Sequence, residues 1–264
     1  MRYHSIPPGK KLSDFIRYFW VLESESPYTH HSMADVCPEL LFHYRGRFDE
    51  IFEGGITEKS FISGIQGQCC QTRKFQINRS FGIFGVYFYP HAIPLVFDVP
   101  TVEFTGEMVS LDTWSRNWGS MLESRVMEAA NNAERIKILS DFVVGRLARH
   151  HSPKRPVFQA INDIIHCQPK TNVKQLAANY CLSERQFERQ FQQFAGMPPK
   201  LFCRITRFHW AMSYYGGRKI KLTDIAAECG YYDQSHFIHD FKHFSGCHPR
   251  QFFTGDTDAT SWRD

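Results

Sequence analysis

An internal repeat dominates the carboxyl-terminal half of the chain: a helical pattern over residues 173–202 returns over residues 222–252. The matched positions of the first copy are Val173, Leu176, Ala177, Ala178, Phe187, Phe191, Phe194, Gly196, Pro199 and Phe202. Their counterparts, 49 or 50 residues later, are Leu222, Ile225, Ala226, Ala227, Phe237, Phe241, Phe244, Gly246, Pro249 and Phe252. A short helix with paired alanines, a turn and a second amphipathic helix are typical of a helix-turn-helix, because small side chains let the helices cross closely. The repeat therefore predicts two helix-turn-helix units.

Charge is distributed unevenly along the 264 residues, whose net charge is +4. Residues 153–254 carry 14 Lys and Arg against 7 Asp and Glu, a net +7, whereas residues 1–152 carry 16 against 17, a net −1. A basic half that is also rich in aromatic residues favours a polyanionic partner, since phosphate contacts supply most non-specific affinity for nucleic acid. The alternative is a basic face that is merely solvated.

The length and the polar, proline-containing stretch at 150–156 predict two domains. We expect an amino-terminal domain over residues 1–150, a linker over 151–156, a repeat domain over 157–254 and a flexible tail over 255–264. No apolar run is long enough to span a membrane and no signal peptide is recognisable, which favours a cytoplasmic protein without a membrane partner. The eight cysteines lack C-x-x-C spacing, so we expect reduced thiols.

The amino-terminal half carries strand patterns and then helical ones. Short β-branched and aromatic runs separated by turn residues are typical of an antiparallel sheet or small β-barrel; they cover residues 15–22, 39–44, 61–65, 73–77 and 81–89. Apolar residues at helical spacing predict a helix over Asn132–Arg149. This helix could pack on its own domain or form the seam of a homodimer, and the sequence leaves both open. The predicted fold class is therefore α+β, with an all-α domain after the barrel.

In the first repeat copy, Ser183 and Gln186 form a capping box at the start of the second helix. The phenylalanines at i, i+4 and i+7 must face the core. At ~100° per residue, the positions opposite that stripe are those of Arg185, Arg189 and Gln192, with Glu188 on the flank. These long side chains can form hydrogen bonds with DNA.

In the second copy, Asp233 is the expected cap of the equivalent helix. The face opposite its phenylalanine stripe carries Ser235, His239 and Lys242. Ile238 takes the flank position, and Gln234 and His236 lie in the first turn, where a recognition helix touches base edges. The two helices thus share a scaffold but present different side chains.

A single helix over Pro199–Tyr215 is expected to join the two units, with Arg204 and Arg207 at its sides. Spaced in this way, the units could enter successive major grooves, which lie ~34 Å apart. We expect base contacts from Arg185, Glu188, Arg189, Gln234, Ser235, His236, Ile238 and His239. We expect phosphate contacts from Ser183, Gln192, Arg204, Arg207 and Lys242. Plain solvation is the alternative for each exposed residue, and Arg204 and Arg207 could instead pair with a carboxylate within the domain.

The second unit resembles the AraC/XylS family of bacterial transcription regulators. The resemblance lies in the run from Ile225 to Phe237, then in Phe241-Lys242, Gly246 and Pro249. It implies two helix-turn-helix units joined by a long helix and sequence-specific binding of promoter DNA, with RNA polymerase as a partner. His239 stands where this family very often has Arg, which puts guanine recognition at that position in doubt and makes contact there depend on pH.

The amino-terminal half resembles, more weakly, the cupin-like sensory domains that precede this module. The resemblance lies in residues 84–92, Phe-Gly-Val-Tyr-Phe-Tyr-Pro-His-Ala, and in the later pair Leu111-Asp112. It implies a regulatory domain that could take a small-molecule effector, without saying which one.

Two other functions remain as alternatives. A metal-dependent cupin enzyme would draw its ligands from His30, His31, Glu39, His43 and His91. The H-x-H motif of cupin metal sites is absent, and adjacent histidines on a strand point to opposite faces, so we expect no metal, no cofactor and no catalytic residue. A non-specific architectural DNA binder is the second alternative, for which no sensory domain would be needed.

Overall fold

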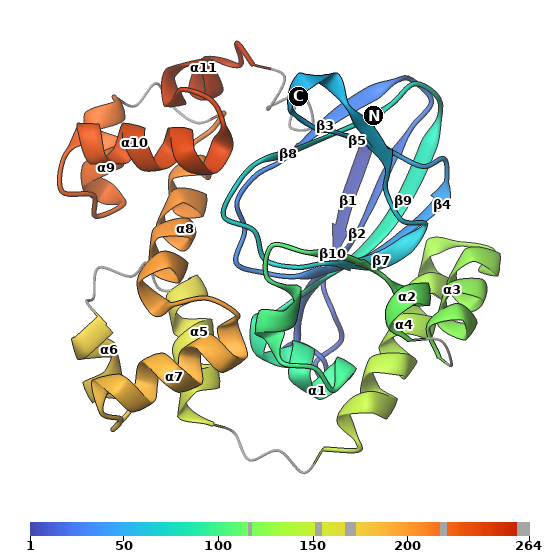
Figure 1. Cartoon of the computed structure of the whole chain (residues 1–264), viewed down its shortest axis with the longest axis horizontal. Coiled ribbons are helices and arrows are strands. Elements are labelled where there is room, and N and C mark those ends of the chain that lie inside the picture. Colours follow the sequence, from blue (N-terminus) through green and yellow to red (C-terminus); the bar gives the residue numbers. More distant parts are fainter. Residues whose placement is uncertain (116–117, 151–154, 167–172, 217–220, 258–264) are drawn as a thin grey trace.

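The structure, a computed structural model, describes the chain except for residues 116–117, 151–154, 167–172, 217–220 and 258–264. The described strands all lie within residues 2–110, and the helices from residue 156 onward form a carboxyl-terminal domain beside the sheets (Figure 1). Most of the predicted linker and most of the predicted tail fall outside the described residues. No helix in the described ranges is long and apolar enough to cross a membrane.

The strands of the amino-terminal domain form two antiparallel sheets within the described residues. The six-stranded sheet runs, in spatial order, β1 (Arg2–Ile6), β2 (Ile16–Ser24), β9 (Phe81–Phe88), β4 (Glu39–Arg45), β7 (Ser63–Gln66) and β10 (Met108–Ser110). The four-stranded sheet runs β3 (Tyr28–Ser32), β8 (Arg73–Ile77), β5 (Asp49–Ile51) and β6 (Thr57–Lys59). The predicted antiparallel arrangement is confirmed, and its strands form two facing sheets rather than one closed barrel.

The central strands of the larger sheet are buried on both faces, which explains their nearly continuous apolar sequences. On β2, Phe19 and Val21 face the helices of the domain, while Trp20 and Leu22 face the second sheet. Strands with the strongest patterns lie close to their predicted positions. The short strands β1, β3, β5, β6 and β10 were not predicted, because their sequences carry few apolar residues to mark a buried face.

Helices cover the outer face of the six-stranded sheet. They are the short helices η2 (Pro90–Ala92), α1 (Ile93–Phe97), η3 (Thr101–Phe104) and α2 (Leu111–Trp114), followed by α3 (Gly119–Glu128) and α4 (Asn132–Leu147); η1 (Glu53–Gly55) lies between β5 and β6. Asn131 caps α4 by accepting a hydrogen bond from the Glu134 backbone. Leu139 and Val143 of α4 are fully buried in the core shared with Phe84 of β9. Helix α4 therefore packs on its own domain, the first of the two expected arrangements.

The carboxyl-terminal domain is organised around one helix, α8 (Pro199–Met212), which confirms the predicted single connection. At one end of α8 lie α5 (Pro156–His166), α6 (Val173–Asn179) and α7 (Glu184–Ala195). At its other end lie α9 (Leu222–Glu228), α10 (Gln234–Ser245) and α11 (Pro249–Thr254) (Figure 1). The pairs α6–α7 and α9–α10 are the two helix-turn-helix units that the repeat predicts.

The phenylalanine stripes of both repeat copies form the core of this domain. Phe187 and Phe191 of α7 and Phe237 and Phe241 of α10 are all fully buried. Phe191 packs edge-on against Phe202 of α8, with ring centroids 5.1 Å apart. The repeat is thus explained by packing, because each copy inserts the same rings against the shared helix.

We predict that Phe237→Ala lowers the free energy of unfolding by about 3–5 kcal/mol, because it empties a fully buried ring position. Tyr232→Ala is the matched control, since this ring is 92% exposed and its loss should change stability by less than about 0.5 kcal/mol. Urea unfolding followed by circular dichroism measures both. Equal losses for the two variants would show that the stripe is not the core.

Candidate nucleic-acid interface and adjoining cavity

Helix α7 begins and ends at the residues predicted for it. The Ser183 hydroxyl accepts a hydrogen bond from the Gln186 backbone, and the Gln186 side chain accepts one from the Ser183 backbone, which completes the capping box. Gly196 ends the helix in the left-handed conformation, with φ 77°. The polar side chains expected on the outer face are all exposed: Arg185, Glu188, Arg189 and Gln192. The first unit therefore presents a continuous hydrogen-bonding face to solvent.

Helix α10 has the equivalent ends with different surface chemistry. Asp233 caps it by accepting a hydrogen bond from the His236 backbone at 2.7 Å, and Gly246 ends it with φ 73°. Four of its predicted contact residues are exposed: Ser235, His236, His239 and Lys242. Gln234 and Ile238 are half-buried, and Ile238 packs partly against the core. The second unit is therefore less cationic than the first and richer in imidazole.

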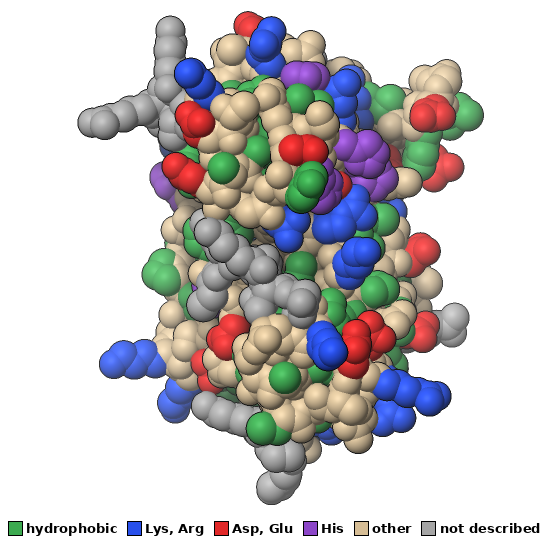
Figure 2. Space-filling view, turned by 90° about the vertical axis from the view of Figure 1, so that its left-hand side faces the viewer, with side chains coloured by type: hydrophobic (Ala, Val, Ile, Leu, Met, Phe, Trp, Pro, Cys, Tyr) green, Lys and Arg blue, Asp and Glu red, His purple; other side chains and the backbone are tan. Residues whose placement is uncertain are grey.

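Lys and Arg side chains lie beside His side chains on the outward face of this domain, with acidic groups between them (Figure 2). His236 and His239 flank the buried carboxylate of Asp240, with nitrogen–oxygen distances of 3.7 and 3.8 Å. The imidazole of His236 also meets the Tyr231 ring edge-on, at 5.4 Å between centroids. The Asp240 carboxylate therefore lies directly beneath His236 and His239 on the exposed face of α10.

Arg204 occupies an ion pair within the domain. Its guanidinium donates to both carboxylate oxygens of Asp240, at 2.7 and 3.3 Å, and Asp240 is fully buried. This hydrogen bonding raises the pKa of the Arg204 guanidinium. Arg207 is half-buried with its guanidinium over the Tyr231 ring, 5.2 Å from the centroid. Arg204 thus pairs with a carboxylate of its own domain, which was the alternative to phosphate contact. Contact of Arg204 or Arg207 with DNA phosphate stays a prediction.

The amino-terminal domain contacts the carboxyl ends of α7 and α10, the second helix of each helix-turn-helix unit, which we call the reading helices. Three side chains donate hydrogen bonds to carbonyls at the end of α7: Gln68 to Ala195 at 2.8 Å, Thr101 to Phe194 at 3.1 Å and Thr105 to Gly196 at 2.9 Å. At the end of α10, the Ala34 backbone donates to the Phe244 carbonyl at 2.9 Å. The last carbonyls of a helix lack partners within it, so these contacts satisfy polar groups that would otherwise be unpaired.

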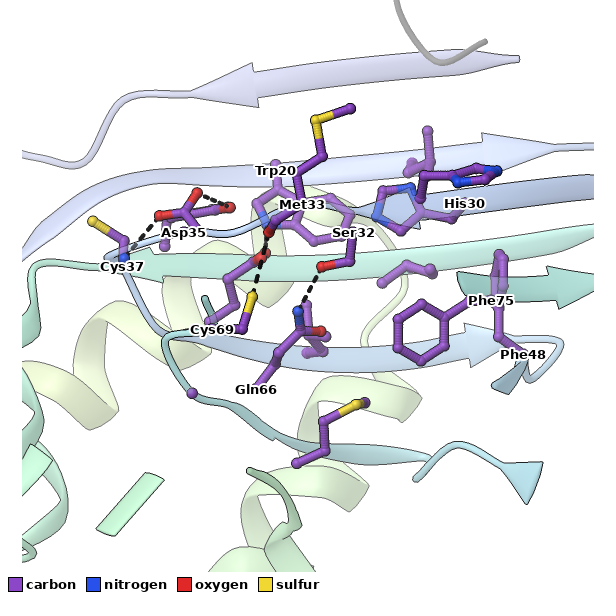
Figure 3. Close-up of a pocket in the computed structure, with 18 of the residues that line it drawn as sticks. Trp20, His30, Ser32, Met33, Asp35, Cys37, Phe48, Gln66, Cys69 and Phe75 are labelled. Atoms are coloured by element: carbon purple, nitrogen blue, oxygen red, sulfur yellow. Dashed lines mark hydrogen bonds between the residues drawn. The ribbon is translucent and has the colours of Figure 1, made fainter. Parts of the chain in front are cut away.

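A cavity of about 290 Å³ lies between the two sheets (Figure 3). Its floor contains a row of residues in register across five strands of the larger sheet, which we call the Glu39 row: Tyr18, Tyr87, Glu39, Gln66 and Met108. Gln66 donates a hydrogen bond to Ser32 on the opposite sheet at 2.9 Å, which ties the two sheets together across the cavity. His209 and Met212 of α8 also line it. The cavity is therefore bounded by both domains.

Ionisable groups in the cavity are strongly affected by burial. Burial and the negative charge of Asp35 raise the pKa of Glu39 to about 8. Burial lowers the pKa of His30 and of His43 to about 4, so both imidazoles are neutral at pH 7. Burial raises the pKa of the Cys37 thiol to about 12 despite the nearby Arg17. The cavity is thus mostly neutral, with its charge confined to a few groups.

The residues considered for a metal site do not converge. His91 lies outside the cavity, where its Nε2 is 2.9 Å from the Asp14 carbonyl oxygen and its ring stacks on Phe158 of α5 at 4.8 Å. His30 and His31 are consecutive residues of β3 and both border the cavity, and opposite directions of their side chains stay a prediction. In the part of the chain that the structure describes, no three His, Cys, Asp or Glu side chains are arranged to hold a metal ion.

The domain contacts were not predicted from the sequence. Gln68, Thr101 and Thr105 are ordinary polar residues, and nothing in their local pattern shows that they lie beside α7. His209 is another example: its Nε2 lies 2.8 Å from the Ala34 carbonyl and 3.4 Å from the Asp35 carboxylate. The sequence does not show which residue of the other domain each of these side chains contacts. The domain interface therefore could not be predicted from it.

Two domain families match this chain. Residues 4–110 match a domain of unknown function (DUF6597), and residues 176–255 match a helix-turn-helix domain. The HTH-type transcriptional activator RhaR of Yersinia pseudotuberculosis serotype O:3 is 33% identical over 79 residues. That similarity covers 28% of this chain and 27% of RhaR, so this chain matches only about a quarter of the length of this relative.

Two solved structures have a weak likeness to this chain. ToxT from Vibrio cholerae is 8% identical with a TM-score of 0.46, over 96% of this chain and 98% of ToxT. The DNA-binding domain of the global transcriptional factor AdpA, solved with a target DNA, is 20% identical with a TM-score of 0.37. It covers 42% of this chain and 97% of the AdpA domain.

We predict that Arg204→Met lowers the free energy of unfolding by about 3 kcal/mol, because Asp240 would be left buried without its counter-ion. The double variant Arg204→Met with Asp240→Leu should recover most of this loss, since no charge is then buried alone. Urea unfolding of the three proteins measures the effect. Unchanged stability of Arg204→Met, combined with weaker DNA binding at all sequences, would instead make Arg204 a phosphate contact.

Proposed function

We propose that this chain, whose carboxyl-terminal domain is a helix-turn-helix domain of the AraC/XylS type, regulates transcription by sequence-specific binding to promoter DNA. The observation that carries the proposal is the pair of capped helices, α7 and α10, which present exposed polar faces at equivalent repeat positions. Because one helix, α8, holds both units, they form one reading surface. Side chains of this kind recognise bases in the major groove.

We infer that the binding site is asymmetric. The first unit presents Arg185, Glu188 and Arg189, which suit guanine and cytosine. In the second unit, Gln234 suits adenine, Ile238 suits a thymine methyl, and Ser235, His236 and His239 complete the face. Ser183, Gln192 and Lys242 are proposed to contact phosphates, together with Arg207. Because the two helix-turn-helix units of one chain differ, the DNA site that they bind need not be palindromic.

We also propose that the amino-terminal domain is regulatory. Its cavity touches α8, and the segment 33–37 that borders the cavity also contacts the end of α10 through Ala34. A ligand that alters this segment would change how the second reading helix is held, which is a direct route from an effector to DNA affinity. RNA polymerase is the proposed partner at the promoter, and the cytoplasm is the proposed location; a homodimer stays a prediction.

We predict that Arg189→Ala relaxes specificity at one base pair, at a cost of ~1–3 kcal/mol for the preferred base only. Fluorescence anisotropy on a selected site and its single-base variants, at one salt concentration, measures this. Lys137→Ala is the matched control, since it removes an exposed cation from α4 of the other domain. A uniform loss at all variants would make Arg189 a phosphate contact instead.

Competition between selected and random duplexes separates this proposal from a non-specific architectural binder. The regulator should prefer its site by roughly 10³-fold or more at matched salt. Equal affinities would favour the architectural alternative. Stoichiometric metal in the purified protein would revive the enzyme alternative.

A further inference from the structure

Glu39 lies at the centre of the cavity floor and has no ion-pair partner among the described residues. Protein surrounds its side chain, although part of its surface borders the cavity. Trp20 donates a hydrogen bond to it at 2.9 Å and Tyr87 also forms a side-chain hydrogen bond with it, but no Lys, Arg or His of the described residues forms an ion pair with it. Acidic side chains are seldom buried without a partner, so this position requires an explanation.

Aromatic rings stand around this acid in the same register. Tyr87 is its direct cross-strand neighbour on β9, and Tyr18 follows on β2 with its ring centroid 4.9 Å from that of Tyr87. Trp20 reaches Glu39 by lying across Gly85, where an added Cβ would come within 2.3 Å of the indole. The absence of a side chain at Gly85 is thus what brings the indole to the carboxyl.

The other charged groups of the cavity have partners of their own. Arg17 donates to the Cys37 sulfur at 3.4 Å and is attracted by Asp35. Asp35 accepts hydrogen bonds from the Cys37 backbone at 2.8 Å and from the Tyr87 hydroxyl at 3.0 Å. Because His30 and His43 are neutral, they do not supply a positive charge to Glu39. Its carboxyl group therefore has no ion-pair partner among the described residues.

We propose that the cavity binds a small organic ammonium with an apolar or aromatic body, whose charge pairs with Glu39 and lies against the rings of Tyr18, Trp20 and Tyr87. A carboxylate together with aromatic faces is the chemistry that recognises such cations. Leu22, Leu41 and Ile83, on the adjoining rows, would contact the body of the ligand. The inference rests on the proposed function, in which the occupant of this cavity is the effector.

The size of the cavity limits the ligand. At about 290 Å³ it lies at the lower end of the ~300–1,000 Å³ that small-molecule sites usually span. A compact amine with one ring fits this range better than a long chain does. Because His209 and Met212 also line the cavity, the bound amine would lie next to α8.

Binding should depend on pH in a defined direction. Among the described residues, the titratable groups that interact with Glu39 are Asp35, Tyr18, Tyr87, Cys37 and Cys69. Burial raises the pKa of both tyrosines and both thiols, which keeps them neutral near pH 7. Since the pKa of Glu39 is about 8, it must lose a proton to pair with an ammonium. Affinity should therefore be lower at pH 6 than at pH 8, by roughly 10- to 50-fold.

Isothermal titration calorimetry of the full-length protein tests the proposal with matched probes. These are benzylamine, phenethylamine and 3-phenylpropylamine, with neutral 2-phenylethanol and anionic phenylacetate for comparison. At pH 8, at least one amine should bind at least tenfold more tightly than the alcohol, and phenylacetate should not bind. Equal binding of amine and alcohol, preference for phenylacetate, or binding of none of the five would overturn the proposal.

Two variants assign the effect to the cavity. Glu39→Gln keeps the shape of the side chain and should weaken amine binding at least tenfold while leaving any binding of the alcohol unchanged. Glu53→Gln is the control, since it removes an exposed carboxylate outside the cavity. If Glu39→Gln does not fold, Trp20→Phe should still weaken amine binding on the order of fivefold. Full amine affinity in either cavity variant contradicts the assigned site.

The same protein preparations distinguish this inference from the proposed function. Anisotropy with a selected duplex reports DNA recognition without any effector. Specific DNA binding without amine binding would overturn the ligand class and leave the regulator intact. Amine binding without specific DNA binding would overturn the proposed function and leave the ligand class intact.

Discussion

Hydrogen bonds from the amino-terminal domain to the carboxyl ends of α7 and α10 fix how these two helices lie against the sheets. A helix leaves its last carbonyls without partners, and here the amino-terminal domain supplies donors to both reading helices. Docking the helices by one end leaves their first turns, with the capping residues Ser183 and Asp233, directed away from the sheets (Figure 1). The contacts that join the domains therefore also orient the surface proposed to read DNA.

The segment 33–37 connects this docking to the cavity. Its Ala34 backbone donates to the end of α10, its Ala34 carbonyl lies 2.8 Å from His209 of α8, and its Asp35 borders the cavity. Ala34, Val36 and Cys37 belong to the same apolar cluster as the phenylalanine stripes. A change in the cavity thus has a short physical path to the second reading helix, because both depend on one stretch of backbone.

The sequence predicted the repeat domain closely because its signals are local. Capping residues, left-handed glycines and phenylalanines at helical spacing each act within a few residues, so the sequence alone places Ser183, Gly196 and Phe187. The amino-terminal domain was predicted only as antiparallel. Whether its sheets close depends on pairings between distant strands, and short polar strands such as β3 carry little apolar pattern.

In the candidate site, too, the sequence predicted the local features but not the contacts between distant residues. The outer faces of α7 and α10 were predictable from helical geometry, whereas the pairing of Arg204 with Asp240 joins two helices and could be named only as an alternative. The Glu39 row arises from the register of five strands, and register depends on turns and bulges throughout the sheet. The sequence marks Glu39 as a conceivable metal ligand, but it does not predict the aromatic side chains around it, which come from strands far apart in the chain.

We propose that one chain recognises DNA with two unlike helices, α7 and α10. Footprinting of the full-length protein on a site selected from random duplexes tests it most directly. We expect protection on one face of the duplex in two successive major grooves, about 10 base pairs apart, with different sequences under each. A palindromic site, protection of a single groove, or no enriched sequence would contradict it.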